Sequence, residues 1–229
     1  MSHNILFAGA TGLIGSLVLP RLLPRLPADA RVLAVGRRAP ALSDPRVVPI
    51  IGALNHADLH ARLDAALTAH PPSVFVCTLG STMRQAGSES AFAALDRDAV
   101  VALAERARAH GARQAVVVSS VGADVNSASF YLRVKGEMQA AVIALGFSRV
   151  DFLQPGLLLG PRVNDRRPGE RIAQVLAPLY NPLLGGRLHR YRAIPAATVA
   201  AALTALLDAP GSGITLHRND ALIELAAGG

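Results

Sequence analysis

A tyrosine and a lysine four residues apart, Tyr131 and Lys135, are the side chains of this sequence best suited to proton transfer. The stretch 126–137 is typical of a helix start, and side chains at this spacing lie one turn apart on the same helix face. An ordinary phenol, with a pKa of about 10, exchanges protons poorly at neutral pH. A neighbouring ammonium favours the phenolate and makes that exchange easier. We therefore expect Tyr131 to donate or accept a proton, with Lys135 as its partner.

The composition singles out the same lysine. Of the 23 lysine and arginine residues, Lys135 is the sole lysine and all the others are arginines. Lysine carries a compact point charge on a flexible stem, whereas arginine carries a planar fork, so the two side chains are not interchangeable. A specific role for Lys135 is therefore expected.

Two serines, Ser119 and Ser120, follow a predicted strand at 114–118 and precede Tyr131 by twelve and eleven residues. A hydroxyl at this strand end would hydrogen-bond a substrate oxygen and orient it. The sequence leaves open which serine does so. Since a Tyr-x-x-x-Lys pair arises often by chance, the interpretation depends on its coincidence with the serines, the strand and the sole lysine. The alternative is an exposed helical tyrosine and lysine without a catalytic role.

The elements that would position these groups begin with a glycine-rich stretch near the N-terminus. An apolar run at 5–8 predicts a buried strand, three glycines follow it, and apolar residues then recur at helical spacing. Glycines permit a sharp turn and close approach to phosphates, and a helix N-terminus offers free N–H groups. A glycine-rich turn without a ligand is the alternative. The predicted cofactor-binding residues here are Gly9, Thr11, Gly12, Leu13, Ile14 and Gly15.

The second predicted strand, 31–35, ends at Gly36, Arg37 and Arg38. In a dinucleotide-binding fold this strand end faces the adenosine ribose, where an acidic residue would hold the 2′-hydroxyl of NAD. Two arginines stand there instead, which favours a 2′-phosphate and therefore NADP(H). A solvated basic loop is the alternative interpretation.

Further strands are predicted at 45–51, 73–77 and 149–153, with helices between them, including one continuous helix at 90–109. After the strand at 73–77, Leu79 and Gly80 would line the cofactor, Gly80 by allowing close backbone approach. This alternation predicts an α/β, Rossmann-type, doubly wound parallel sheet with helices on both faces. We expect a single NAD(P)-binding domain over 1–229, with a core at 1–153.

The remaining segment, 154–229, is expected to supply a small substrate-side cap and the last helices. The cap would span 160–192, where Arg162, Arg166 and Arg167 are candidates to meet a phosphate or an acidic substrate. A helix at 196–207 would pack on the core, and 214–216 would add a last strand.

The composition and net charge limit the kinds of binding partner that we expect. The chain has 229 residues, a net charge of +7 and 4% aromatic residues, but no dense basic tract, so we expect no specific nucleic-acid binding. The sequence contains no apolar run of about 18 residues, so we expect no membrane span. Because a strand is predicted at the start, we expect no room for a signal peptide.

A single cysteine, Cys77, indicates a reducing compartment, and we predict a cytoplasmic protein. His56, His60 and Asp64 fall on one helix face, but no metal site is predicted.

Taken in order, several stretches resemble the short-chain dehydrogenase/reductase superfamily and, within it, the atypical Tat-interacting-protein-like NAD(P)-binding oxidoreductases. The resemblance runs from residue 4 to about 171, and one departure is Gln154, where an arginine is usual. The stretches that carry it are 9–15, 35–38, 79–82, 96–98, 119–124, 131–137 and 155–159.

The resemblance implies NADPH bound by the glycine stretch, by Arg37 and Arg38, and by Leu79 and Gly80. It also implies an NADP-dependent oxidoreductase acting on a carbonyl-type small molecule through a serine, Tyr131 and Lys135. Founding members of the subgroup are regulators that contact other proteins. The alternative is therefore an NADPH-binding sensor that acts through a protein partner without catalysis.

Overall fold

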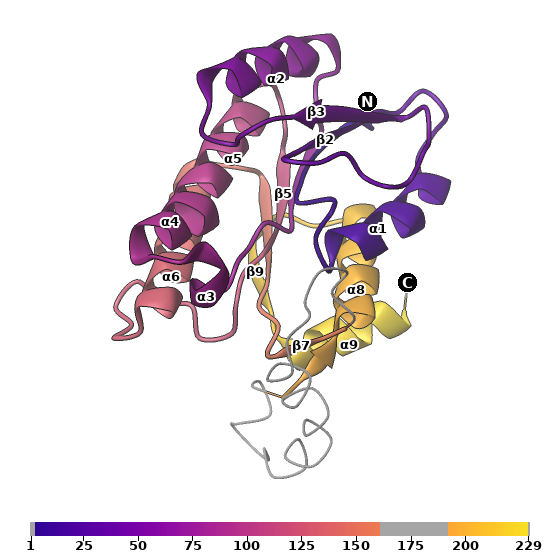
Figure 1. Cartoon of the computed structure of the whole chain (residues 1–229). Coiled ribbons are helices and arrows are strands. Elements are labelled where there is room, and N and C mark those ends of the chain that lie inside the picture. Colours follow the sequence, from indigo (N-terminus) through magenta and orange to yellow (C-terminus); the bar gives the residue numbers. More distant parts are fainter. Residues whose placement is uncertain (1–2, 161–191, 229) are drawn as a thin grey trace.

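The computed structural model describes residues 3–160 and 192–228, and seven parallel strands in this part form one sheet in the order β3-β2-β1-β4-β5-β6-β9 (Figure 1). A second sheet pairs β7 (Leu158–Leu159) with β8 (Ile194–Pro195). The strands of the main sheet are β1 (Ile5–Ala8), β2 (Val32–Gly36), β3 (Val47–Ile51), β4 (Val74–Cys77), β5 (Gln114–Val118), β6 (Arg149–Leu153) and β9 (Gly213–His217).

Helices cover both faces of the sheet (Figure 1). One face packs against α1 (Gly15–Leu22), α8 (Ala196–Asp208) and α9 (Asn219–Ala227). The other packs against α2 (Ala57–Ala69), α5 (Ala99–Ala109) and α6 (Phe130–Ala144). The shorter helices are η1 (Leu23–Arg25), α3 (Met83–Ala86) and α4 (Glu89–Ala93).

The strand sequences explain this layering. In β1, Leu6 faces one core and Phe7 the other, and both side chains are fully buried. Strands of a parallel sheet covered on both sides are apolar at nearly every position, which explains the continuous apolar runs of β1 and β4. The predicted Rossmann-type doubly wound sheet with helices on both faces is confirmed.

The order of the strands reverses between β1 and β4. From β1 the chain proceeds outward through β2 to β3, and it then returns to β4 and proceeds the other way. Ala8 at the end of β1 is in register with Val35 of β2 and Cys77 of β4. The loops after these three strands therefore leave the sheet at one edge, where doubly wound folds bind their ligands.

The predicted continuous helix at 90–109 is divided in the structure. A π-helical turn, η2 (Ala94–Asp98), separates α4 from α5. Single π turns carry an extra residue within a helix and are often found at functional sites. The fully buried Asp96 lies in this turn, and its carboxylate accepts hydrogen bonds from Ser81 in the loop after β4.

The C-terminal part of the chain completes the core. The predicted helix at 196–207 corresponds to α8, and the predicted last strand corresponds to β9 at the edge of the main sheet. Residues 161–191 lie outside the described residues, and with them nearly all of the predicted cap and its candidates Arg162, Arg166 and Arg167. Within the described ranges, no helix is both long and apolar enough to cross a membrane.

Candidate active site

The glycine-rich stretch forms a tight turn packed against the segment after β4. Gly9 has φ +89°, and a Cβ there would lie 2.7 Å from the Leu79 backbone nitrogen. A Cβ on Gly15 would lie 2.2 Å from the Gly9 carbonyl oxygen. The same carbonyl accepts hydrogen bonds from the Gly12 N–H at 3.0 Å and the Thr78 hydroxyl at 2.9 Å. The first and third glycines are therefore required by the protein's own backbone, since any side chain would collide with it.

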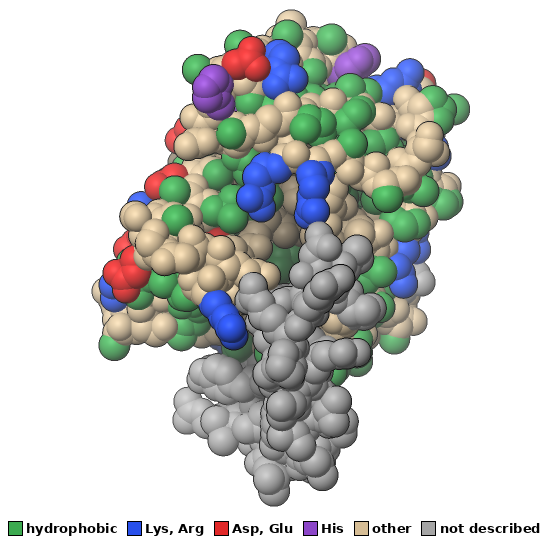
Figure 2. Space-filling view, in the orientation of Figure 1, with side chains coloured by type: hydrophobic (Ala, Val, Ile, Leu, Met, Phe, Trp, Pro, Cys, Tyr) green, Lys and Arg blue, Asp and Glu red, His purple; other side chains and the backbone are tan. Residues whose placement is uncertain are grey.

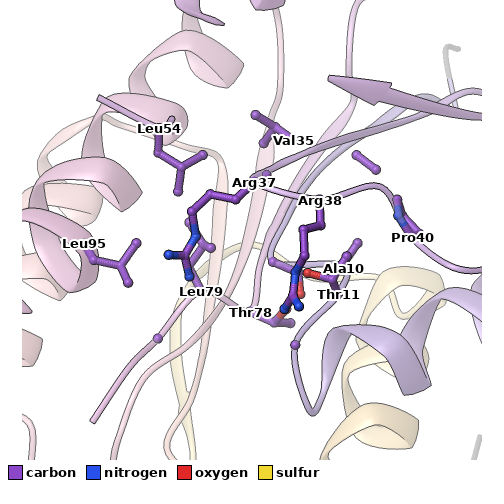
Figure 3. A pocket seen from close by; sticks show the side chains of 15 residues that line it. Ala10, Thr11, Val35, Arg37, Arg38, Pro40, Leu54, Thr78, Leu79 and Leu95 are labelled. Carbon is purple, nitrogen blue, oxygen red and sulfur yellow. The ribbon is translucent and has the colours of Figure 1, made fainter. Parts of the chain in front are cut away.

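A pocket opens where the loops after β1, β2 and β4 meet. In Figure 3 the side chains of Arg37 and Arg38 extend from the end of β2 over the pocket, toward Leu79 and Thr11. The pocket is lined by Gly9, Ala10, Thr11, Gly12, Ala34, Val35, Gly36, Arg37, Arg38, Pro40, Leu54, Thr78, Leu79, Gly80 and Leu95. Three separate groups of predicted cofactor residues thus come together.

The other predicted residues of the glycine stretch lie outside this lining. Leu13 is half-buried and packs against the core, and Ile14, only 5% exposed, is part of that core. Gly15 begins α1. Leu13, Ile14 and Gly15 thus lie where the turn meets α1, and their predicted contact with the cofactor stays a prediction.

The charged side chains among the described residues that line the pocket are all positive. None of the described residues that line it is acidic, and both Arg37 and Arg38 are exposed. Across the described ranges, neither arginine forms an ion pair with a carboxylate. Figure 2 shows basic side chains bordering a hollow at the centre of this face. Two guanidinium groups without such partners provide a site for an anion.

Lys135 is buried and ion-paired. Its Nζ lies 2.7 Å from Oδ1 of Asp96, and the two side chains are 4% and 0% exposed. A Cβ on Gly80 would lie 3.5 Å from this Nζ. Because Gly80 also lines the pocket, the ammonium lies directly behind the pocket wall.

Tyr131 lies in the first turn of α6, one helical turn before Lys135. It is half-buried, and its ring centroid is 5.2 Å from that of Phe92 on α4, at an interplanar angle of 38°. This tilted aromatic contact fixes the ring against α4. The helical spacing of Tyr131 and Lys135 is as predicted, and Tyr131 contacts α4 while Lys135 lies beside Gly80 of the pocket lining.

The two candidate serines have different surroundings. Ser119 is 6% exposed, and its Oγ accepts a 2.6 Å hydrogen bond from Nε2 of Gln139. Oε1 of Gln139 in turn accepts a 3.3 Å hydrogen bond from Nε2 of Gln154. The half-buried Ser120 donates a 3.3 Å hydrogen bond to the Val121 carbonyl. Ser119 is thus part of a buried network that uses Gln154, the residue standing in place of the usual arginine.

Sequence reasoning missed Asp96 and Gln139 as members of this site. Asp96 is part of a stretch that carries the family resemblance, but the helical spacing of the apolar residues on either side gives no sign of the π turn. Nothing in the spacing of Gln139 indicates its bond to Ser119, twenty residues earlier. Both contacts join elements that are distant in sequence.

Three other side chains considered in the sequence analysis, those of Cys77, His60 and Asp64, are buried or bonded within the protein. Burial raises the pKa of the Cys77 thiol to about 12, as expected of an inert buried cysteine. His60 hydrogen-bonds the Leu54 carbonyl at 2.7 Å, and Asp64 pairs with Arg106. Across residues 3–160 and 192–228, no group of three or more side chains is suited to hold a metal ion.

A family model described as NAD(P)H-binding matches residues 9–158. The chain belongs to this NAD(P)H-binding family. It is 34% identical over 208 residues to "Protein fmp52, mitochondrial" of Emericella nidulans, covering 89% of this chain and 88% of that protein. It is 33% identical over 230 residues to "Protein HTATIP2" of Rattus norvegicus, covering 98% and 89%. Together these matches place the chain in the HTATIP2-like group of atypical short-chain dehydrogenases/reductases, as the sequence resemblance predicted.

Solved structures agree on the fold of this NAD(P)H-binding chain. The Bordetella bronchiseptica enzyme WbmH, in complex with NAD+, has a TM-score of 0.68 at 16% identity, with 99% of this chain and 80% of that chain covered. A short chain dehydrogenase from Burkholderia cenocepacia, in complex with NADP, has a TM-score of 0.64 at 16% identity, covering 99% and 92%. At such identities the likeness concerns the fold.

The pocket residues of this family member fit a dinucleotide. The glycine turn keeps side chains away from the end of β1, so that backbone N–H groups can approach a pyrophosphate. Arg37 and Arg38 would hold an anionic group at the end of β2, and Leu79 and Gly80 would line the opposite wall.

Proposed function

We propose that this chain is an NADP(H)-dependent oxidoreductase that reduces a carbonyl-type small molecule with a serine, Tyr131 and Lys135. One observation carries the proposal. Gly80 borders the cofactor pocket on one side and the ammonium of Lys135, the sole lysine, on the other. This proximity supports assigning the cofactor residues and the proton-transfer pair to one site.

Each of the three proposed active-site residues has its own role in the reaction. When bound, the nicotinamide supplies hydride to a carbonyl carbon or accepts it in the reverse direction. Tyr131 gives a proton to the carbonyl oxygen in the reduction direction. Lys135 favours the phenolate that remains and hydrogen-bonds the cofactor ribose. We assign orientation of the substrate oxygen to Ser119, since its hydroxyl accepts a hydrogen bond from Gln139 and keeps its own proton to donate, whereas the Ser120 hydroxyl donates to the Val121 carbonyl.

The preference for NADP(H) rests on Arg37 and Arg38. Both NAD+ and NADP are found with this fold, the first in the Bordetella enzyme and the second in the Burkholderia dehydrogenase. The choice therefore depends on local residues. Two arginines at the end of β2, with no acidic residue among the described lining, suit a 2′-phosphate and offer nothing to accept a hydrogen bond from a free 2′-hydroxyl.

The location of the protein stays a prediction. We infer a cytoplasmic protein from its single cysteine, whereas the fmp52 relatives carry names that place them in mitochondria. Fractionation of cells that express the tagged chain distinguishes the two compartments.

Two measurements on the unmodified chain test the function. The first compares NADPH and NADH binding by fluorescence and by melting shift, and we expect tighter binding of NADPH. The second follows NADPH consumption across a panel of aldehydes, ketones and quinones, and we expect turnover with at least one class. Tight NADPH binding with no consumption across the panel would instead favour the sensor that acts through a protein partner.

A further inference from the structure

The buried ion pair between Asp96 and Lys135 is supported by further hydrogen bonds to the carboxylate. Besides the ammonium at 2.7 Å, the Asp96 carboxylate accepts hydrogen bonds from the Ser81 N–H at 3.0 Å and the Ser81 hydroxyl at 2.7 Å. Removing two charges from water is costly, and apolar side chains of similar size often give equal or greater stability. The pair therefore calls for an explanation other than stability.

Three separate segments meet at this carboxylate. Asp96 comes from the π-helical turn η2, Lys135 from α6 and Ser81 from the loop after β4. Leu79 and Gly80, which immediately precede Ser81, line the cofactor pocket, as does Leu95 beside Asp96. A single side chain thus ties the pocket wall to the helix that carries Tyr131 and Lys135.

Asp96 cannot itself touch a ligand. Its side chain is 0% exposed and its oxygens are taken up by Ser81 and Lys135, whereas the Lys135 side chain keeps 4% exposure and its ammonium has three donors. Any influence of Asp96 on a bound cofactor must pass through the groups that it holds, of which Lys135 carries the charge.

The space around the pair suits an ammonium. A Cβ at Gly80 would lie 3.4 Å from Oδ1 of Asp96 and 3.5 Å from Nζ of Lys135, so the backbone passes close to both charges. A planar guanidinium is larger than an ammonium and presents its donors in a fixed fork. This narrow site gives a physical reason why the chain, which otherwise uses arginine in place of lysine, has a lysine at this position.

From these contacts we propose that Asp96 is a positioning residue for cofactor binding, which holds the Lys135 ammonium at the pocket wall, within reach of the cofactor ribose. Asp96 acts through Lys135 and has no separate contact with the cofactor. This inference rests on the proposed function, since it assigns Lys135 to the nicotinamide side of a bound dinucleotide.

A double-mutant cycle tests the proposal with NADPH as the probe. The variants are Asp96→Asn, Lys135→Met and the two combined, and the readouts are the NADPH dissociation constant and the melting temperature. We expect each single variant to weaken NADPH binding roughly 10-fold or more, the loss expected for one hydrogen bond to a charged group. In the Lys135→Met background, Asp96→Asn should cause no further loss, because the group it positions is gone.

Controls separate positioning from folding. Asp98→Asn removes an exposed carboxylate from the same π turn, where it pairs with Arg97, and should leave NADPH binding unchanged. If Asp96→Asn alone fails to fold, the combined variant restores a neutral pair. Ser81→Ala then loosens the carboxylate with both charges kept, and it should weaken NADPH binding only while Lys135 is present.

The outcomes distinguish this inference from the proposed reaction. Equal losses of NADPH affinity from Asp96→Asn or Ser81→Ala, with Lys135 present or replaced, would assign Asp96 a purely structural role and overturn the inference. Unchanged affinity in Asp96→Asn would also overturn it. If the wild-type chain binds NADPH and consumes none of the carbonyl panel, the reaction fails while the affinity cycle still decides the role of Asp96. Failure of the wild-type chain to bind NADPH would overturn both.

Discussion

The Nζ of Lys135 lies 3.5 Å from the point that a Cβ on Gly80 would occupy. This distance corresponds to ordinary van der Waals contact, so Gly80→Ala should fold and bind NADPH within about threefold of the wild type. Gly80→Val places further methyl groups against the ion pair, and we expect a loss of NADPH affinity of about tenfold or more. Fluorescence titration of both variants checks this, and equal affinities for the alanine and valine variants would contradict it.

Gly15 should tolerate no side chain at all. A Cβ there would lie 2.2 Å from the Gly9 carbonyl oxygen, a backbone atom that cannot rotate away. We expect Gly15→Ala to lower the free energy of unfolding by about 2–3 kcal/mol, as overpacked substitutions do. Urea unfolding measures the change. Gly36→Ala is the matched control, since a Cβ there meets only the Arg38 carbonyl at 3.8 Å, and a loss as large as that of Gly15→Ala would refute the explanation.

The cofactor preference should depend on the two arginines after β2. Replacing both, as Arg37→Ala with Arg38→Ala, is expected to weaken NADPH binding about 10- to 100-fold, because charged hydrogen bonds to a phosphate are lost. NADH lacks that phosphate, so its affinity in the same variant serves as the internal control and should change little. Parallel losses for both cofactors, or equal affinities in the wild type, would remove the argument.

Acid should weaken the edge of the sheet at β9. Burial raises the pKa of Asp151, but hydrogen bonds from His217 and Arg149, the charge of Arg149 and a hydrogen bond from Gln114 outweigh it and hold the pKa below its usual 3.8. A carboxyl with a lowered pKa in the folded state stabilises the protein above its unfolded-state pKa, and this stabilisation is lost as the pH falls through the folded value.

Asp151→Asn tests that expectation. At pH 7 the variant should be less stable than the wild type by about 3 kcal/mol, since Arg149 loses its buried partner. The difference should shrink below about pH 4 as the wild-type carboxyl is protonated. Unfolding free energies at pH 7 and pH 3 measure it, and a constant difference would exclude this account of Asp151.

Much of the site could be predicted from sequence because parallel strands bring their carboxyl ends to one edge. Once β1, β2 and β4 were recognised as short apolar runs, the residues after them had to meet, and Gly9, Arg37 and Leu79 do. The predicted fold depended on the same regular alternation, which survives small errors in strand boundaries.

What could not be predicted depends on packing between distant segments. The apolar periodicity from Phe92 to Leu103 fits one α-helix, and the extra residue of the π turn leaves no trace in that pattern. For the same reason, the sequence identified Lys135 by composition but not its partner Asp96, 39 residues earlier on another helix. The choice between Ser119 and Ser120 likewise depends on which hydroxyl keeps its proton free, which the contacts of Ser119 with Gln139 and of Ser120 with the Val121 carbonyl decide.

Tyr131→Phe tests the central claim most directly, because it removes one phenolic oxygen and leaves the ring contact with Phe92 in place. The measurement is the rate of NADPH oxidation with the carbonyl compound that the wild type turns over best, together with the NADPH dissociation constant. We expect cofactor binding within about twofold of the wild type and turnover at least about 100-fold slower, the usual contribution of general acid catalysis. Turnover at the wild-type rate would contradict the assignment of Tyr131 as the proton donor.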